Sequence, residues 1–486
     1  MRFSKLSIVI LFCSIFEFQT DYTSLKSCLR SKKSTAEVIT RRDVTFNETN
    51  FQFIFDNQIQ PLGFILVQSK KDVVKTVKCG RILNLHFTIR GGGHSYAKYS
   101  FGSNHSWIID VSGLNKIKFN YRTKIVTVDS GLKLTDINNQ LWKKFRYGVV
   151  SGTCGAVGVS GFSMGGGFGY HMRKYGLAVD QIVGIKMVTA NGNVIKVNKN
   201  RNADLFWAIR GAGAAGFGVV TELKLKTFPA FSTFVWANLK YSLNNFSIVL
   251  IRWQQILKFR NCSTIGFRIN RKVINQTSDS ADNVMFTFVI TDYRGENEQF
   301  ETLKTFLPNV TDNDIKRGTY LEMLKDIDGK WSNCTSFLRQ KSWFVSRYLS
   351  EKEIEMFVDL VRDRIYAGFA IEPCPSPESQ PMRTETAYVH RDCVFMVKIR
   401  YYLKACDANT INNAILLDNE YYKGLNELAN LLSFMDNGES YQNYEDDDLI
   451  EWRKRYYAEN YDRLKMIKTK FDPINFFRFN HSISPM

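Results

Sequence analysis

Two glycine-rich segments carry the side chains of this chain that are best suited to chemistry. The first reads RGGGHSY over residues 90–96 and follows an apolar run, residues 82–89, that predicts a strand. Glycine can adopt positive φ and lets the backbone approach a ligand closely. Successive N–H groups can then turn toward an anion such as a diphosphate. Glycine runs also occur in plain turns, so this segment alone does not separate a binding loop from a turn.

The second segment reads SGTCGAVGVSG over residues 151–161 and leads into GGGFGY over residues 165–170. It presents Cys154 between glycines, much as the first segment presents His94. A cysteine in such a place is also a common small core residue, and a lone histidine is commonly part of a core or turn. The two side chains become informative only as a pair.

Together, the two segments resemble those of the berberine-bridge-enzyme-like FAD-linked oxidases, a family with the vanillyl-alcohol-oxidase type of fold. The resemblance runs from about residue 57 to the C-terminus and is weakest in the middle third. It implies that His94 is alkylated by the flavin 8α-methyl carbon and that Cys154 bonds to flavin C6. The cofactor-binding residues that it implies are Arg90, Gly91, Gly92, Gly93, His94, Ser95, Gly152, Cys154, Val157, Gly158, Gly161, Gly165, Gly166, Gly167, Gly213, Gly218 and Val220.

The fold implied by this resemblance is α+β and two-lobed. A chain of 486 residues is also too long for one ordinary core. We expect a signal peptide at 1–20, a lead-in at 21–56 and a PCMH-type FAD-binding domain at 57–229. An α/β substrate domain would occupy 230–440, and a berberine-bridge-like segment, 441–486, would return to the first domain.

Hydrophobic periodicity predicts the main elements of both domains. Strands are expected at 64–67, 82–89, 107–111, 125–128, 231–239, 283–291 and 393–403, and helices at 70–83, 134–145, 353–365, 411–432 and 452–466. Asn191-Gly192 predicts a two-residue hairpin between strands at 184–188 and 194–197. The acidic stretch 440–450 is expected to be an exposed loop.

A third glycine pattern, GAGAAG over residues 211–216, matches the dinucleotide fingerprint G-x-G-x-x-G. That fingerprint requires a strand before it and a helix after it. Here a helical segment comes before and a strand-like segment follows, so a nicotinamide site is disfavoured. In the resembling family, this segment continues the flavin-binding wall.

The catalytic base is expected at Tyr456, in the segment WRKRYYAENYDRL of residues 452–464, on the same resemblance. A phenol is a poor base at neutral pH unless a cation lowers its pKa, and Lys398 and Arg400 are the candidate cations. Tyr96 matches a substrate-side tyrosine of carbohydrate-oxidising relatives. The alternative is that Tyr456 only packs on a helix.

Other positions bear on the type of reaction. A small branched residue at Val157 leaves room for oxygen in the resembling family, which implies an oxidase that forms hydrogen peroxide. Phe162 and His481 depart from the family pattern, so fine tuning of the flavin is in doubt. The glutamate base of the alkaloid-cyclising member has no clear counterpart, which disfavours alkaloid ring closure.

The N-terminus predicts export: a basic start precedes an 11-residue apolar run, residues 6–16, which is too short to span a bilayer. No other long apolar run suggests a membrane anchor. Eight N-x-S/T sequons fit a glycosylated, secreted protein: Asn47, Asn104, Asn245, Asn261, Asn275, Asn309, Asn333 and Asn480. The resemblance pairs Cys28 with Cys79. The pairing of the remaining cysteines stays open: Cys262, Cys334, Cys374, Cys393 and Cys406.

The formal net charge of +18 raises the possibility of nucleic-acid binding. The basic residues are spread along the chain, and no nucleic-acid-binding motif is present, so a basic solvated surface is favoured. Affinity for an acidic polysaccharide is a further hypothesis. No metal site is predicted, and we expect a monomer.

The leading hypothesis is a secreted oxidase with bicovalent FAD, which oxidises a hydroxyl of a carbohydrate or small alcohol and uses molecular oxygen. One alternative is a flavin dehydrogenase with a non-oxygen acceptor. Another is a secreted flavin-binding protein with little turnover. The sequence does not specify the substrate, because the resemblance is weakest where the substrate cleft is expected.

Overall fold

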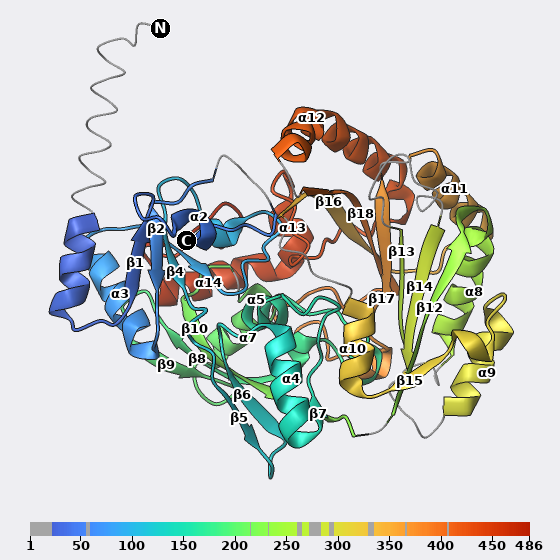
Figure 1. Cartoon of the computed structure of the whole chain (residues 1–486), viewed down its shortest axis with the longest axis horizontal. Helices are drawn as coiled ribbons and strands as arrows, with labels where there is room; N and C mark the ends of the chain where they lie inside the picture. The colour runs from blue at the N-terminus through green and yellow to red at the C-terminus, as the bar shows by residue number, and fades with distance from the viewer. Residues whose placement is uncertain are drawn as a thin grey trace, which may run out of the picture.

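The computed structural model describes residues 22–54, 59–213, 215–231, 233–259, 265–271, 283–290, 296–328, 335–364, 367–405 and 408–486. These residues form two lobes that lie side by side (Figure 1). The predicted signal peptide, three of the sequons (Asn261, Asn275 and Asn333) and the cysteines Cys262, Cys334 and Cys406 lie outside the described residues.

The first lobe begins with a four-stranded sheet of order β1-β2-β4-β3. Its strands are β1 (Glu37–Thr40), β2 (Gly63–Leu66), β3 (Phe87–Arg90) and β4 (Trp107–Asp110). Helix α3 (Lys70–Ile82) connects β2 to β3. The strand predicted at 82–89 is observed as β3, which starts five residues later than predicted, at Phe87. Residue 82 still belongs to α3. The expected Cys28–Cys79 disulfide is present, with Cα atoms 5.9 Å apart, and ties the helix of residues 22–31 to α3.

A second, antiparallel sheet of order β5-β6-β10-β8-β9 completes this lobe. Its strands are β5 (Ile117–Asn120), β6 (Ile125–Asp129), β8 (Ile182–Val188), β9 (Val194–Val197) and β10 (Val219–Lys226). The helices α4 (Leu134–Phe145), α5 (Val159–Met164) and α7 (Ala203–Ala212) belong to the same lobe. The β8–β9 hairpin is present, but its turn is longer than predicted: the Thr189 amide bonds to the Asn193 carbonyl, and Gly192 takes a φ of 75°.

The second lobe is built on a seven-stranded sheet of order β15-β12-β14-β13-β17-β18-β16. The strands are β12 (Phe234–Ser242), β13 (Ile265–Arg271), β14 (Asn283–Ile290), β15 (Lys316–Gly318), β16 (Thr335–Val345), β17 (Gly368–Pro373) and β18 (Phe395–Ala405). Four helices cover its outer face (Figure 1): α8 (Phe246–Lys258), α9 (Glu296–Phe306), α11 (Glu351–Arg362) and α12 (Ala408–Leu431). A contact between two helices joins the lobes: Tyr320 of α10 (Tyr320–Asp328) donates a hydrogen bond to Asn138 of α4.

The chain then returns to the first lobe (Figure 1). The predicted helix at 452–466 is divided into α13 (Trp452–Tyr457) and α14 (Tyr461–Phe471), because Ala458 has a φ of 42° that no α-helix accommodates. After α14, Phe477 forms a bridge with Phe87 of β3. The buried Lys468 ammonium donates to the Asp472 carboxylate and to two backbone carbonyls, at 2.6–2.8 Å, which fixes this return.

The two chemistry-bearing loops of the first lobe touch through their backbones. A Cβ atom added at Gly92 would lie 2.2 Å from the Gly158 amide nitrogen, and one added at Gly158 would lie 2.5 Å from the Gly92 nitrogen. No real Cβ contact is that short, so both positions require glycine. The contact brings the loop that carries His94 against the loop that carries Cys154.

We expect Gly92→Ala to lower the free energy of unfolding by about 1–3 kcal/mol, because the added methyl overpacks a backbone-to-backbone contact. Chemical unfolding followed by tryptophan fluorescence measures the change. Gly184→Ala is the matched control, since its Cβ would meet its nearest neighbour at an ordinary 3.6 Å. Equal stability of the two variants would contradict the inferred role of the contact.

Candidate active site

A cavity of about 560 Å³ has walls from both lobes, within the size range of ligand sites in proteins. The first lobe contributes the loops of residues 91–96 and 152–162 and the glycines of the α7–β10 turn. The second lobe contributes β13, β17 and β18, and the segment 441–445 closes another side. The expected site residues that line the cavity are Gly91, Gly92, Gly93, His94, Ser95, Tyr96, Gly152, Cys154, Val157, Gly158, Gly161, Gly213, Gly218, Val220, Lys398 and Arg400.

The two side chains singled out by the sequence both lie on this wall. The His94 imidazole stacks on Phe53, with ring centroids 4.0 Å apart. Burial lowers the pKa of His94 to about 4, and the nearby Lys133 acts in the same direction. The imidazole is therefore neutral at physiological pH, which is the nucleophilic form. Cys154 carries a reduced, half-buried thiol.

Four expected binding residues do not line the cavity. The Arg90 guanidinium turns to Asp110 and to the Thr49 carbonyl, and it lies 4.4 Å from the Phe64 ring centroid. It supports the glycine loop from behind. Gly165, Gly166 and Gly167 pack against other segments instead: Cβ atoms there would lie 2.0, 2.7 and 2.4 Å from atoms of Asn443, Tyr441 and Ala178. Those glycines admit neighbouring side chains, not a ligand.

The expected base, Tyr456, also lies away from the cavity. Its ring is buried in the core of the first lobe, and its hydroxyl accepts a hydrogen bond from the Asp446 amide at 3.0 Å. Burial raises the pKa of Tyr456 far above that of a free phenol. The Tyr456 ring packs in the core in this structure, and its predicted role as the base stays a prediction.

The stretch at 440–450 is not the exposed loop that the acidic composition predicts. Ser440, Tyr441, Gln442 and Asp446 are buried, and four residues of the segment line the cavity: Tyr441, Asn443, Tyr444 and Glu445. The acidic residues misled the prediction because two of their carboxylates pair with cations of the second lobe and the first loop, as described below.

A polar cluster faces the cavity from the second lobe. Arg268 of β13 pairs with Glu372 of β17 at 3.1 Å, and Tyr444 donates a hydrogen bond to the same carboxylate at 3.2 Å. The Lys398 ammonium of β18 lies 3.6 Å from the Tyr444 ring centroid, a cation–π distance. Arg268 also donates to Thr153, next to Cys154, at 2.7 Å.

Sequence analysis found Lys398 and Arg400 but missed Arg268, Glu372 and Tyr444. The available signal was alternation: along β13, residues 265, 267 and 269 enter the apolar core while Arg268 points to the opposite face. Glu372 shows that a carboxylate does reach the cavity, which sequence comparison with the alkaloid-cyclising member did not suggest.

The tyrosines of this cluster are protonated at neutral pH. Burial raises the pKa of Tyr96 to about 12, and burial together with the Glu372 charge raises that of Tyr444 further. Neither phenol is a base by itself. Burial and the nearby Arg268 cation lower the pKa of Arg400.

Comparison with known protein families matches residues 61–198 to an FAD binding domain and residues 440–484 to the berberine and berberine-like domain. The protein is an FAD-linked oxidoreductase that is similar to the berberine-bridge-enzyme-like proteins. This oxidoreductase is 29% identical to Berberine bridge enzyme-like 23 of Arabidopsis thaliana, over 93% of this chain and 90% of the relative. It is also 29% identical to a carbohydrate oxidase of Microdochium nivale, over 88% of each chain.

The fold agrees with this assignment. The solved structure of the wild-type berberine-bridge-enzyme-like 1 of Physcomitrella patens superposes with a TM-score of 0.83 and 22% sequence identity, over 95% of this chain and 99% of that chain. The expected α+β fold of the vanillyl-alcohol-oxidase type is confirmed, and so is the expected cofactor, FAD. Among the described residues, no helix combines the length and the apolar composition that a bilayer span requires.

The cavity residues of the oxidoreductase fit FAD. Three successive glycines, Gly91–Gly93, and the glycines of the α7–β10 turn line the cavity, and glycine backbone of this kind can present N–H groups to a diphosphate. Gly216 and Gly218 adopt φ of 95° and 147°, which lets the wall turn closely past the cavity. Neutral His94 and the Cys154 thiol supply nucleophiles at the same wall.

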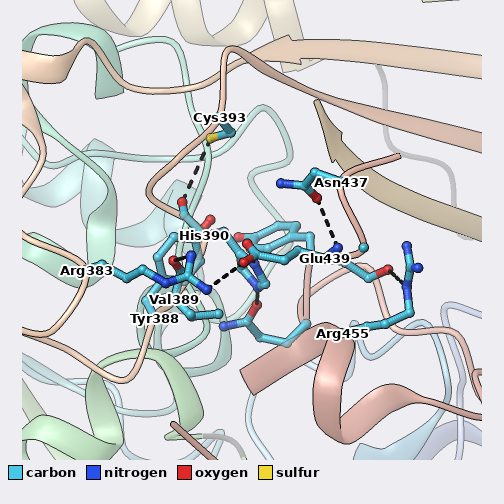
Figure 2. Close-up of polar contacts among 12 residues, drawn as sticks. Arg383, Tyr388, Val389, His390, Cys393, Asn437, Glu439 and Arg455 are labelled. Atoms are coloured by element: carbon cyan, nitrogen blue, oxygen red, sulfur yellow. Dashed lines mark hydrogen bonds and ion pairs between the residues drawn. The ribbon is translucent and has the colours of Figure 1, made fainter. Parts of the chain in front are cut away.

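A buried network holds the segment that closes the FAD cavity (Figure 2). Both carboxylate oxygens of Glu439 are engaged, one by Arg383 at 2.6 Å and the other by the His390 Nδ1 at 2.8 Å. The other ring nitrogen of His390 meets Gln442 at 3.0 Å, and the Gln442 amide donates to the Gly211 carbonyl at 2.8 Å. The network therefore connects the loop before β18 to residues 439–442 and to Gly211 of α7.

A disulfide encloses the loop that carries His390. Cys374 and Cys393 are bonded, with Cα atoms 6.0 Å apart, which settles one pairing that the sequence left open. Within this loop, the His390 ring stacks on Phe344, with centroids 4.4 Å apart. Burial lowers the pKa of His390, while the Glu439 carboxylate opposes that shift.

We expect His390→Phe to lower the free energy of unfolding by about 1–3 kcal/mol, because the ring contact is kept while Glu439 and Gln442 lose buried hydrogen-bond partners. Thermal or urea unfolding measures the loss. His105→Phe makes the same exchange at an exposed position and should change stability little. An unchanged free energy of unfolding in His390→Phe would show that the network does not hold segment 439–442.

Proposed function

We propose that this oxidoreductase oxidises a hydroxyl group of a carbohydrate or small alcohol and passes the electrons to molecular oxygen, forming hydrogen peroxide. The observation that carries the proposal is that two different sets of residues line one cavity. Nucleophiles and glycine loops suited to FAD come from the first lobe, and a buried acid–base cluster comes from the second. The similarity to a carbohydrate oxidase supports a sugar as substrate.

Covalent attachment of FAD through His94 and Cys154 is part of the proposal. When bound, FAD supplies the hydride acceptor that no side chain can provide. His94 is neutral because burial lowers its pKa, so its ring nitrogen can act as a nucleophile. The contact between Gly92 and Gly158 supports the proposal, because it holds the two linking loops together.

The proton of the substrate hydroxyl would leave through Tyr444 and Glu372. Tyr444 donates its own proton to the Glu372 carboxylate in the resting arrangement. It can accept the substrate proton on its oxygen as its own proton passes to Glu372. The phenol then never has to ionise, which agrees with its raised pKa. Glu372 is the base, and Tyr444 relays the proton to it.

The surrounding cations would assist this transfer. Arg268 pairs with Glu372 and keeps a carboxylate available as the acceptor. Lys398 lies over the Tyr444 ring and would orient it, while Arg400 and Tyr96 complete the cavity wall toward the substrate. Hydroxyl-rich substrates suit such a wall, because its donors and acceptors bind alcohol groups directly.

Use of oxygen is supported by Val157, a small side chain on the cavity wall. Release of hydrogen peroxide during turnover of a sugar or alcohol separates this proposal from a dehydrogenase that needs another acceptor. A panel of mono- and oligosaccharides and small alcohols, assayed for peroxide under air, tests both the substrate class and the acceptor.

We also propose that the protein is secreted, glycosylated and monomeric, with the domain limits at 57–229, 230–440 and 441–486. Two disulfides support passage through an oxidising compartment. The sequon asparagines among the described residues are exposed: Asn47, Asn104, Asn245, Asn309 and Asn480. Glycosidase-dependent loss of mass from the secreted protein tests this part of the proposal.

Removing one linking residue should leave FAD attached through the other. We expect His94→Ala and Cys154→Ala each to keep the yellow colour with the protein after acid precipitation. The double variant should release the colour into the supernatant. The wild type with all its flavin in the acid supernatant would contradict covalent attachment.

Tyr444→Phe should lower kcat by about 10²-fold or more, because it removes the proton relay to Glu372, while the flavin absorbance stays unchanged. Tyr456→Phe is the control: its hydroxyl bonds to a backbone amide away from the cavity, so kcat should change little. Steady-state kinetics on the best substrate of the panel makes the comparison. A large loss of kcat in Tyr456→Phe with little change in Tyr444→Phe would indicate that Tyr456 is the base.

A further inference from the structure

Glu445 is a carboxylate on the cavity wall with an unusual set of partners. Its Oε2 accepts hydrogen bonds from the Ser95 hydroxyl and from the Ala97 amide, the latter at 3.0 Å. The Tyr96 amide is a further donor. Every one of these groups belongs to the turn directly after His94, so one side chain from the end of the chain holds the turn that presents His94 and Tyr96.

The neighbouring aspartates form ion pairs, whereas Glu445 does not. Lys341 pairs with Asp446 at 2.8 Å, and Lys98 and Arg339 lie 3.6 and 3.4 Å from Asp447. Within the part of the chain that the structure describes, no cation pairs with Glu445. Its charge is therefore stabilised by neutral donors alone, at a half-buried position on the cavity wall.

The other titratable groups near Glu445 are either neutral tyrosines or a second carboxylate, and neither kind stabilises its negative charge. Tyr99, Tyr456 and Tyr457 all lie close enough for the Glu445 charge to raise their pKa values. They stay protonated and carry no charge at physiological pH. The Asp447 carboxylate adds repulsion. The ionised form of Glu445 is therefore less stable in the folded protein than the protonated form.

We propose that Glu445 is a positioning residue of the FAD pocket, which clamps the turn of residues 95–97 and holds a negative charge at the pocket wall although that charge destabilises the protein. The clamp keeps His94 aimed at the cofactor. The charge makes the carboxylate a stronger acceptor for the hydroxyl and the two amides than a neutral group would be. This inference concerns the FAD pocket and is independent of the substrate.

Burial raises the pKa of Glu445 to about 7, well above that of a free glutamate. The folded protein therefore binds this proton more tightly than the unfolded chain does. The stability that comes with protonation is present at low pH and is lost as the pH rises through about 7. Replacing the carboxylate by a neutral isostere should remove this pH dependence.

The first experiment compares thermal unfolding midpoints of the flavin-loaded wild type and Glu445→Gln between pH 5 and pH 8. We expect the variant to gain stability relative to the wild type as the pH rises. Asp448→Asn, an exposed acid in the same run, should follow the wild type across the range. A difference that is flat, or that turns against Glu445→Gln at high pH, would overturn the buried-charge part of the proposal.

The second experiment maps flavin-modified tryptic peptides in Glu445→Ala, which loses the clamp. This readout relies on the covalent links proposed above. We expect loss of flavin from the His94 peptide while the Cys154 peptide keeps it, with Glu445→Gln intermediate. Retention of both modified peptides would overturn the clamp. A wild type without either peptide would refute the covalent links, and the pH-dependent unfolding would still decide the role of the charge.

Discussion

The contact between Gly92 and Gly158 is the constraint on which the site depends. Two loops that are more than sixty residues apart in sequence meet backbone to backbone, with no room for a Cβ atom on either side. His94 and Cys154 reach the same cavity because of this contact. Arg90 and Glu445 then support one of these loops, from behind and from the C-terminal segment, respectively.

The two lobes divide the chemistry of the site between them. The first lobe offers flexible glycine backbone and two nucleophiles, which suit the binding and linking of FAD. The second lobe offers a rigid sheet, where alternation places Arg268, Glu372 and Lys398 on one face while apolar neighbours enter the core behind them. A precise cavity follows from this division, because acid–base groups on strands are held more firmly than groups on loops.

Electrostatics of the cavity are arranged by burial more than by ion pairs. Burial keeps His94 neutral and Tyr444 protonated, and it raises the pKa of Glu445 to about 7. The segment 439–446 carries several of these groups, and its first part is anchored by the His390 network (Figure 2). Shape and charge of the cavity therefore depend on a stretch that enters it from the far end of the chain.

The resemblance carried by the two glycine-rich segments implied the cofactor, the two-lobed fold and the Cys28–Cys79 disulfide, and hydrophobic periodicity predicted many of the helices and strands. The elements follow from local periodicity, and the rest follows from motifs that resemble those of a known family. The sequence predicted the start of β3 too early and the β8–β9 turn too short, and it did not predict the break at Ala458. Local patterns compete at these places. Only the tertiary structure decided that Tyr456 lies outside the cavity and that Arg268, Glu372, Tyr444 and Glu445 line it. Their contacts join residues that lie 72 to 350 positions apart in the sequence, and composition cannot tell a carboxylate on a cavity wall from a solvated one.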